Sequence, residues 1–135
     1  MAQTLEVEIE QIGATTSRGR SRSHGVVIDR PVDRGGEDQG PTGGEYQLIA
    51  LGGCFMSTLL AAIRTRNADV SQVQIVLTGS IDGNPPRFTA IQMKVAARHN
   101  DSELLRKLIT IAERGCIVTN TLRSAVDISV VFENA

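Results

Sequence analysis

The sequence predicts an α+β fold in which antiparallel strands pack around one long central helix. Several short segments alternate apolar and polar residues, as strands with one solvated face do. A helical run covers residues 45–66 and carries no charge between Leu48 and Ile63. Two further alternating segments flank the turn GNPP, which favours an antiparallel pair.

The length and composition favour a single domain over residues 1–135, with an aliphatic core. The chain has 135 residues, of which only 3% are aromatic. Fourteen basic and fifteen acidic residues leave a net charge of −1, which gives no overall attraction to nucleic acid or to an anionic membrane. We therefore expect neither of these partners.

The N-terminal third is predicted to hold two short strands and a long loop. The pattern LEVEI at residues 5–9 predicts the first strand, and HGVVID at residues 24–29 predicts the second. Residues 13–23 between them are polar and rich in turn formers. Residues 30–44 contain two prolines and five glycines, so we expect a loop, and loops of this length are usually functional or disordered.

The uncharged helix at residues 45–66 has apolar residues at spacings of three and four. A helix without a solvated face is buried centrally or lies between subunits. Gly52 and Gly53 interrupt it, although each glycine costs about 1 kcal/mol relative to alanine inside a helix. Cys54 follows directly, which raises the question of whether the glycines serve its thiol.

The C-terminal half is predicted to form a strand pair, a second helix, a helical turn and a last strand. The strands cover residues 73–82 and 87–98, and a change of alternation between Phe88 and Ile91 indicates a bulge. Asn100 and Glu103 resemble a capping box ahead of a helix that ends at Gly115. Residues 116–122 (CIVTNTL) suggest a helical turn, and apolar residues alternate in the strand predicted at residues 126–132.

The two cysteines do not indicate a disulfide scaffold or a metal site. The N-terminus carries three glutamates in its first ten residues and no apolar run, so we expect neither signal peptide nor anchor and place the protein in the cytoplasm. Thiols stay reduced there. A zinc site would need His24 and His99 as well, without any closely spaced ligand pair, so we expect no metal and no cofactor.

Each candidate site residue also has a structural interpretation. Cys54 on its own is typical of a small buried hydrophobe. Cys116 begins a helical turn, where backbone N–H groups lower a thiol pKa. Glu45 lies nine residues before Cys54, on the opposite side of a straight helix. It must therefore precede the helix, act through an arginine, or come from a second copy, unless it only complements the helix dipole.

Five arginines lie between Arg18 and Arg34, in segments predicted to be loops or short strands. They are typical of solvated charges, and an arginine-rich loop also suggests phosphate or nucleic-acid contact. No phosphate-binding glycine motif precedes a helix, and almost no aromatic residue could stack on bases. Nucleic-acid binding thus stays a minor alternative that steep salt dependence would reveal.

Four stretches carry a resemblance to a known family: GGEDQGPTGGE leading into EYQLIALGGC, then LTGSID with PPRFTAIQMKV, and ERGCIVTNTLRSAVDI. In this order the chain resembles the OsmC/organic hydroperoxide resistance family of thiol peroxidases. The resemblance implies an OsmC-like fold with Cys54 as the peroxidatic and Cys116 as the resolving cysteine. It also implies Glu45 and an N-terminal arginine, Arg18 or Arg20, beside the thiolate.

The resemblance leaves Arg22 and Arg34 open as alternatives for that arginine. The family's prolines are replaced by Gly43 and Gly44 before the glutamate, and by Ile117 after the second cysteine. ALGGC and GPTGGE are closer to the OsmC-like branch than to the organic hydroperoxide reductases.

The resemblance further implies an intertwined homodimer that reduces organic hydroperoxides and is restored by a dithiol. The two glycines before Cys54 would then let a neighbouring backbone or a peroxide approach the sulfur. The rival hypothesis is a non-catalytic dimeric module that binds a small apolar ligand.

Overall fold

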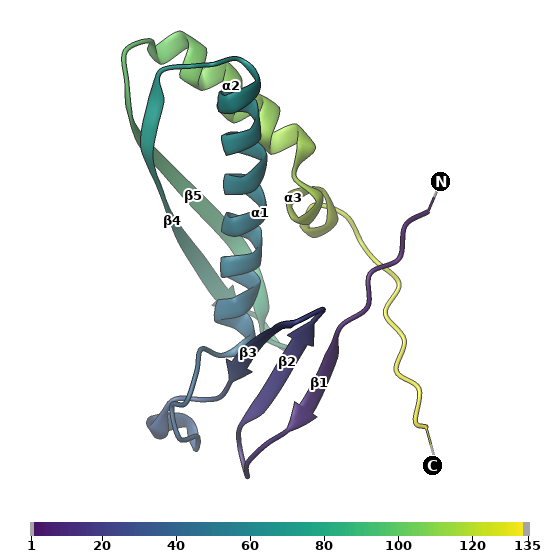
Figure 1. Cartoon of the computed structure of the whole chain (residues 1–135). Coiled ribbons are helices and arrows are strands. Elements are labelled where there is room, and N and C mark those ends of the chain that lie inside the picture. Colours follow the sequence, from purple (N-terminus) through teal and green to yellow (C-terminus); the bar gives the residue numbers. More distant parts are fainter. Residues whose placement is uncertain (1, 134–135) are drawn as a thin grey trace. The chain divides into compact units, whose positions relative to one another are not determined.

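The computed structural model describes residues 2–133 and contains two compact units that meet between Gln47 and Leu48. Each unit is described by itself below, and Figure 1 labels the elements of both. A single domain over residues 1–135 therefore stays a prediction.

The first unit is built on a three-stranded antiparallel sheet in the order β1-β2-β3. Its elements are β1 (Glu8–Gln11), β2 (Ser17–Ser21), β3 (His24–Ile28) and a 3-10 helix, η1 (Val32–Arg34). The sequence interpretation missed β2, which lies within residues 13–23, and placed the start of β1 three residues too early. β2 is polar, but it pairs on both sides, and its Gly19 leaves room for Ile9 and Val26.

A buried carboxylate orders the long loop that follows β3. Asp29 is 2% exposed and accepts hydrogen bonds from the hydroxyls of Thr15 and Thr16 and from the N–H groups of Arg30 and Gln39. Burial by itself would raise the pKa of Asp29, but these hydrogen bonds outweigh it and lower the pKa to about 2. Hydrogen bonds to the Asp29 carboxylate thus hold the predicted loop at its start and near its middle.

The second unit contains most of one long helix, a strand pair and two further helices. Its elements are α1 (Gly43–Thr65, entered from the first unit), β4 (Val70–Asp82), β5 (Arg87–His99), α2 (Ser102–Gly115) and α3 (Ile117–Leu122). These confirm the predicted long helix, strand pair, second helix and helical turn. The predicted bulge is also present, since Ser80 pairs with Ala90 and Ile81 with Phe88, which leaves Thr89 unmatched.

The cap of α2 differs from the prediction by one residue. Asp101, in extended conformation, accepts a hydrogen bond from the N–H of Leu104 at 3.1 Å. Asn100 instead donates its side-chain amide to Asp69. A carboxylate and an amide can both cap a helix, so the sequence alone does not separate two adjacent candidates.

α1 is the core helix of the second unit. Its Leu51, Phe55 and Leu59 are at most 5% exposed and pack with Leu108 and Ala112 of α2, while β4 and β5 contribute half-buried side chains. By length and composition alone α1 would also be able to cross a membrane. Because its buried residues form this core with α2, we interpret it as a core helix.

The strand predicted at residues 126–132 does not form in the described chain. The segment after α3 is irregular, and five of its apolar side chains are at least 63% exposed: Val126, Ile128, Val130, Val131 and Phe132. A strand requires a neighbouring backbone to complete its hydrogen bonds, and no strand within residues 2–133 pairs with this segment. The alternation of apolar residues that predicted a strand is present in the sequence, but a strand also needs a second strand to pair with.

Candidate active site

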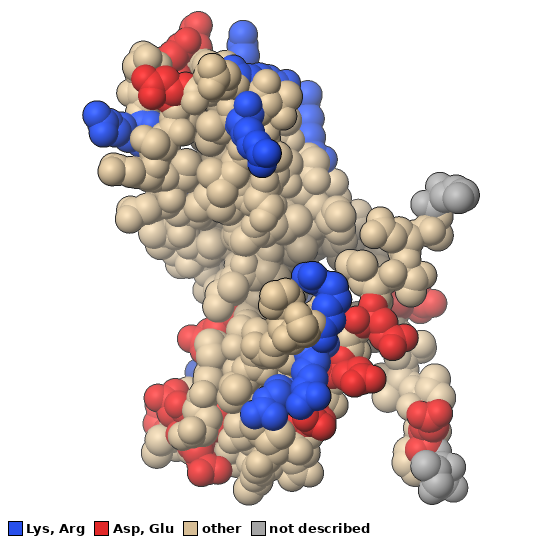
Figure 2. Space-filling view, in the orientation of Figure 1, with Lys and Arg blue, Asp and Glu red and all other residues tan. Residues whose placement is uncertain are grey.

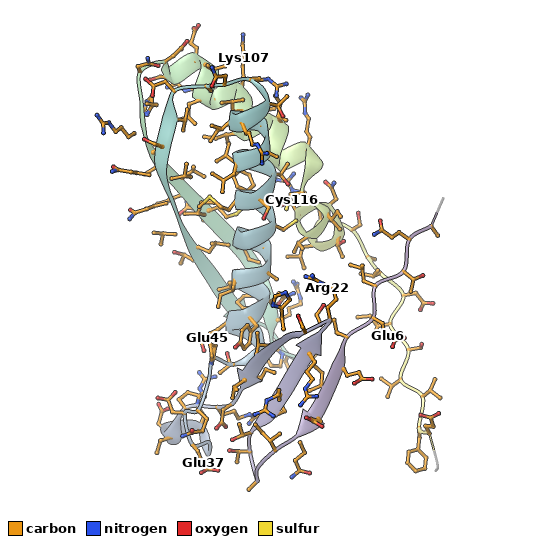
Figure 3. All side chains as sticks on the ribbon, viewed as in Figure 1. Glu6, Arg22, Glu37, Glu45, Lys107 and Cys116 are labelled. Carbon is orange, nitrogen blue, oxygen red and sulfur yellow. The ribbon has the colours of Figure 1, made fainter. Side chains whose placement is uncertain are left out.

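The second unit brings together Cys54 and Cys116, which lie 62 positions apart in the sequence. Cys54 lies on α1, and Cys116 lies between α2 and α3, where it packs into the core formed by these helices (Figure 3). The Cys54 thiol is close enough to influence the protonation of Cys116. Both residues are free thiols.

Cys116 occupies the N-cap position of α3. Its sulfur accepts a hydrogen bond from the N–H of Thr119 at 3.4 Å. Burial would raise the pKa of the Cys116 thiol, but the hydroxyl and N–H of Thr119, the Cys54 thiol and the N–H of Val118 together lower it. This agrees with the expectation drawn from its place at the start of a helical turn.

The two thiols differ in accessibility. Cys116 is completely buried, whereas Cys54 is partly exposed. A molecule arriving from solvent therefore meets the Cys54 sulfur first. Cys116 needs to reach only Cys54, so its burial does not prevent a reaction between the two sulfurs.

A buried hydroxyl next to Cys116 has no hydrogen-bond partner. Thr119 is 5% exposed, and its Oγ1 is unpaired among the described residues. The same hydroxyl lies close enough to the Cys116 sulfur to contribute to the lowered pKa of that thiol. An unsatisfied buried polar group costs about 1–3 kcal/mol, so this hydroxyl lowers the stability of the fold.

The glycines before Cys54 have different environments. A Cβ on Gly52 would lie 2.5 Å from Cδ1 of Leu77 on β4, whereas a Cβ on Gly53 would meet nothing within 4 Å. Gly52 therefore permits close packing of α1 on β4. Of the two, only Gly53 leaves open space beside the helix, as expected for approach of another group.

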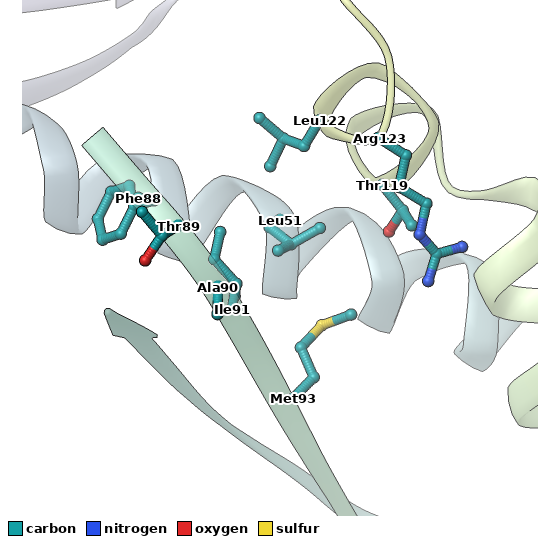
Figure 4. Close-up of a pocket in the computed structure, with 9 residues that line it drawn as sticks. All are labelled: Leu51, Phe88, Thr89, Ala90, Ile91, Met93, Thr119, Leu122 and Arg123. Atoms are coloured by element: carbon teal, nitrogen blue, oxygen red, sulfur yellow. The ribbon is translucent and has the colours of Figure 1, made fainter. Parts of the chain in front are cut away.

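A cavity of about 210 Å³ lies between α1, β5 and α3 (Figure 4). Most of its lining is apolar and comes from β5 and from Leu51 of α1. Thr119 and Arg123 line its α3 side. Neither cysteine is among the residues that line the cavity, and Thr119, whose N–H donates to the Cys116 sulfur, is the lining residue that contacts Cys116.

Glu45 forms hydrogen bonds with Thr42 at the start of α1. The N–H of Thr42 donates to the Glu45 carboxylate at 2.9 Å, and the N–H of Glu45 donates to the Thr42 hydroxyl at 3.1 Å. This is a capping box. Glu45 thus lies in the first helical turn and not before the helix, which removes one of the three ways in which it was expected to reach Cys54.

The predicted arginines belong to the first unit. Arg18 and Arg20 lie on β2, two residues apart and hence on the same face; Arg18 is half-buried and Arg20 pairs with Glu10 at 3.3 Å. Arg22 lies in the turn after β2, and Arg34 ends η1. An approach of any of them to Cys54 stays a prediction.

The sequence interpretation missed Thr119 and Arg123. Once Cys116 is known to cap α3, Thr119 is the residue whose N–H the cap receives, and Arg123 follows one turn later on the same face. Among residues 2–133, no three His, Cys, Asp or Glu side chains gather in a way that would hold a metal ion.

Comparisons with known proteins place this geometry in context. The family model described as OsmC-like protein matches residues 36–131, and no curated protein matches the chain. A hypothetical protein from Aquifex aeolicus has a TM-score of 0.78 at 17% identity, covering 90% of this chain and 89% of its own. An OsmC-like protein of unknown function from Vibrio cholerae has a TM-score of 0.75 at 11% identity, covering 89% and 94%.

A third solved structure is called an organic hydroperoxide resistance protein, from Legionella pneumophila. It has a TM-score of 0.64 at 16% identity and covers 94% of both chains. At these identities the similarity to the solved structures shows the fold.

Proposed function

Because the chain belongs to the OsmC-like protein family, we propose that it is a thiol-dependent peroxidase that reduces organic hydroperoxides. The observation that carries the proposal is the meeting of Cys54 and Cys116, which lie 62 positions apart in the sequence. Structural neighbours named organic hydroperoxide resistance proteins support the same chemistry. The hydrogen bonds that lower the pKa of Cys116 favour its thiolate form.

In the proposed mechanism the Cys54 thiolate attacks the outer oxygen of the hydroperoxide. An S–O bond forms, the O–O bond breaks, and the alcohol leaves after taking up a proton, so that Cys54 becomes a sulfenic acid. The Cys116 thiolate then attacks the Cys54 sulfur, forms a disulfide and releases the oxygen as water. A dithiol reduces this disulfide and restores both thiols.

The difference in exposure supports this division of roles. Cys54 is open enough to meet the peroxide, whereas Cys116 is buried and carries hydrogen bonds that favour its thiolate. In this proposal Arg18 or Arg20 stabilises the Cys54 thiolate and the developing negative charge, and Glu45 orients the arginine.

We propose that the arginine and Glu45 reach Cys54 in a homodimer. α1 exposes Ile49 and Leu60 at 56% and 49%, and the segment after α3 exposes five apolar residues, four of which occupy alternating positions. Figure 2 shows that much of the visible surface over the second unit carries no charged side chain. A second copy would supply the missing strand partner, and either copy could provide the arginine and Glu45.

Two measurements test the dimer. Analytical ultracentrifugation should give the mass of two chains. Removal of the residues that follow Ser124 should shift the equilibrium toward the single chain. A monomer at micromolar concentration would contradict the proposal.

Peroxidase activity is tested with cumene hydroperoxide and dithiothreitol. The parent should consume peroxide continuously, and Cys54→Ser should consume none. Without dithiothreitol, Cys116→Ser should complete one turnover and retain a sulfenic acid that mass spectrometry detects. Equal turnover by Cys54→Ser and the parent would overturn the mechanism.

The second candidate is a non-catalytic module that binds a small apolar ligand, and the cavity beside α3 favours it. It predicts ligand binding without peroxide consumption. For either function we propose a cytoplasmic location, where both thiols would be kept reduced.

A further inference from the structure

The sulfur of Cys116 caps the short helix α3. It accepts a hydrogen bond from the N–H of Thr119 at 3.4 Å, in the place that a side-chain oxygen usually takes at the start of a helix. Thr119 is 5% exposed, so water has little access to replace the sulfur as the acceptor. The start of α3 therefore depends on the state of the Cys116 sulfur.

α3 is a weakly held helix within the described chain. It is six residues long, Ile117–Leu122, whereas isolated helices shorter than about 12–15 residues are marginal in water. Its Ile117 and Leu122 are 73% and 39% exposed, so burial of apolar surface adds little. Two exposed side-chain contacts, from Asn120 and Arg123, join it to α2, and exposed contacts of this kind contribute little. Loss of the cap should therefore be enough to open α3.

Formation of a disulfide changes the Cys116 sulfur as an acceptor. A thiolate accepts a charge-assisted hydrogen bond, which is about twice as strong as a neutral one, and the hydrogen bonds to Cys116 favour its thiolate. In a disulfide the same sulfur is neutral and accepts only weakly. The sulfur also has to move, because a disulfide holds its two sulfurs about 2.05 Å apart, closer than two free thiols can lie. Both changes weaken the hydrogen bond from Thr119.

The cross-link itself would not compensate α3 for this loss. A disulfide stabilises a fold mainly by restricting the unfolded chain within the loop that it closes. The loop between Cys54 and Cys116 contains the second half of α1, β4, β5 and α2. Residues 117–133 lie outside this loop, so the disulfide would stabilise the core of the second unit and leave α3 without its cap.

We propose that α3 is a redox switch: formation of the Cys54–Cys116 disulfide removes its cap and loosens α3 and the segment after it, and reduction orders them again. The inference rests on the disulfide step of the proposed function. In that step the two thiols give up two electrons and two protons, and the hydroperoxide becomes an alcohol and water. Opening of α3 uncovers Cys116, which is completely buried in the reduced protein, to the dithiol that reduces the disulfide.

Loosening of α3 also changes the surface of the second unit. Thr119, Leu122 and Arg123 form the α3 side of the cavity of about 210 Å³. The segment after α3 carries five exposed apolar side chains, and Figure 1 shows it continuing directly from α3. The oxidised chain thus has a more open cavity and a more mobile apolar segment than the reduced chain.

Hydrogen exchange of single amides, followed by NMR in the full-length chain, tests the switch. The reduced protein is kept in tris(2-carboxyethyl)phosphine, and the oxidised protein is made with diamide, which takes up the two electrons and two protons and becomes a hydrazine. On oxidation, the N–H groups of Thr119 and Arg123, which donate within α3, should exchange about tenfold faster, as expected for the loss of a cap. Amides of β4 that pair with β5 lie inside the closed loop and should not exchange faster.

Two substitutions at position 116 provide matched controls, because neither variant can form the disulfide. Serine is a strong N-cap residue and alanine is a poor one. Without any oxidant, the α3 amides should exchange as slowly in Cys116→Ser as in the reduced parent, and as fast in Cys116→Ala as in the oxidised parent. Cys54→Ser keeps the cap but lacks the second thiol, so diamide should leave its α3 unchanged.

Three results would overturn the switch. The first is equal exchange of the α3 amides in the reduced parent and in the oxidised parent, whose disulfide is verified by mass spectrometry. The second is equal exchange in Cys116→Ser and Cys116→Ala. The third is failure of diamide to form the disulfide, which would also refute the role of Cys116 in the proposed mechanism.

The two proposals can fail separately. Consumption of cumene hydroperoxide with unchanged exchange in α3 would support the peroxidase and refute the switch. Faster exchange in α3 after diamide, without consumption of the peroxide, would support the switch and refute the peroxidase.

Discussion

Gly52→Ala is expected to destabilise the second unit, although alanine is the better helix former. A Cβ at this position would lie 2.5 Å from Cδ1 of Leu77. Carbon atoms are in favourable contact at about 3.5–4.0 Å, so Leu77 would have to withdraw by about 1–1.5 Å. Overpacking of this kind costs about 1–3 kcal/mol.

The neighbouring glycine provides a matched control. Alanine gains about 1 kcal/mol over glycine inside a helix, and this gain applies equally to Gly52 and Gly53. Since nothing lies within 4 Å of a Cβ on Gly53, Gly53→Ala should keep the whole gain. The two variants should therefore differ by about 1–3 kcal/mol in the free energy of unfolding, with Gly52→Ala the less stable.

Urea unfolding at one fixed protein concentration measures this difference, because dimerisation would make stability depend on concentration. Leu77→Ala, made in the parent and in Gly52→Ala, should cost less in the second background because it relieves the overlap. Equal stability of the two alanine variants, or no coupling between positions 52 and 77, would refute the packing argument.

Three further predictions concern individual polar side chains. The pKa of Asp29 is lowered to about 2, so its carboxylate stabilises the fold above the unfolded pKa near 4, and this contribution is lost as the pH falls toward 2. In urea melts, the difference in stability between the parent and Asp29→Asn should therefore shrink as the pH falls from about 4 to about 2. A difference that stays constant over this range would contradict the prediction. Asp101→Ala should cost about 1 kcal/mol of stability, whereas Asn100→Ala should stay within about 0.5 kcal/mol, and the reverse order in thermal melts would assign the cap to Asn100. Thr119→Val should raise the pKa of Cys116, measured by ultraviolet thiolate absorbance in a variant whose sole thiol is Cys116; an unchanged titration would exclude the hydroxyl as a cause.

Elements with a strong local period could be predicted from the sequence. The apolar spacing of α1 and α2, the alternation of β4 and β5 and the glycine that ends α2 are all encoded within a few turns or residues. The lowered pKa of Cys116 also follows from a local feature, since it depends largely on the start of α3. The polar strand β2 could not be predicted from the sequence, because its stability comes from pairing with two neighbouring strands and not from the pattern of its own residues.

By itself, the sequence determined the order and type of most elements and the presence of two isolated thiols. Only the tertiary structure decided that the thiols meet, because packing of α1 against α2 joins positions 62 residues apart. It also decided that Gly52 leaves room for the Leu77 side chain and that Thr119 and Arg123 line one cavity. Side-chain period depends on neighbours along the chain, whereas contacts between distant segments depend on how apolar surfaces are buried together.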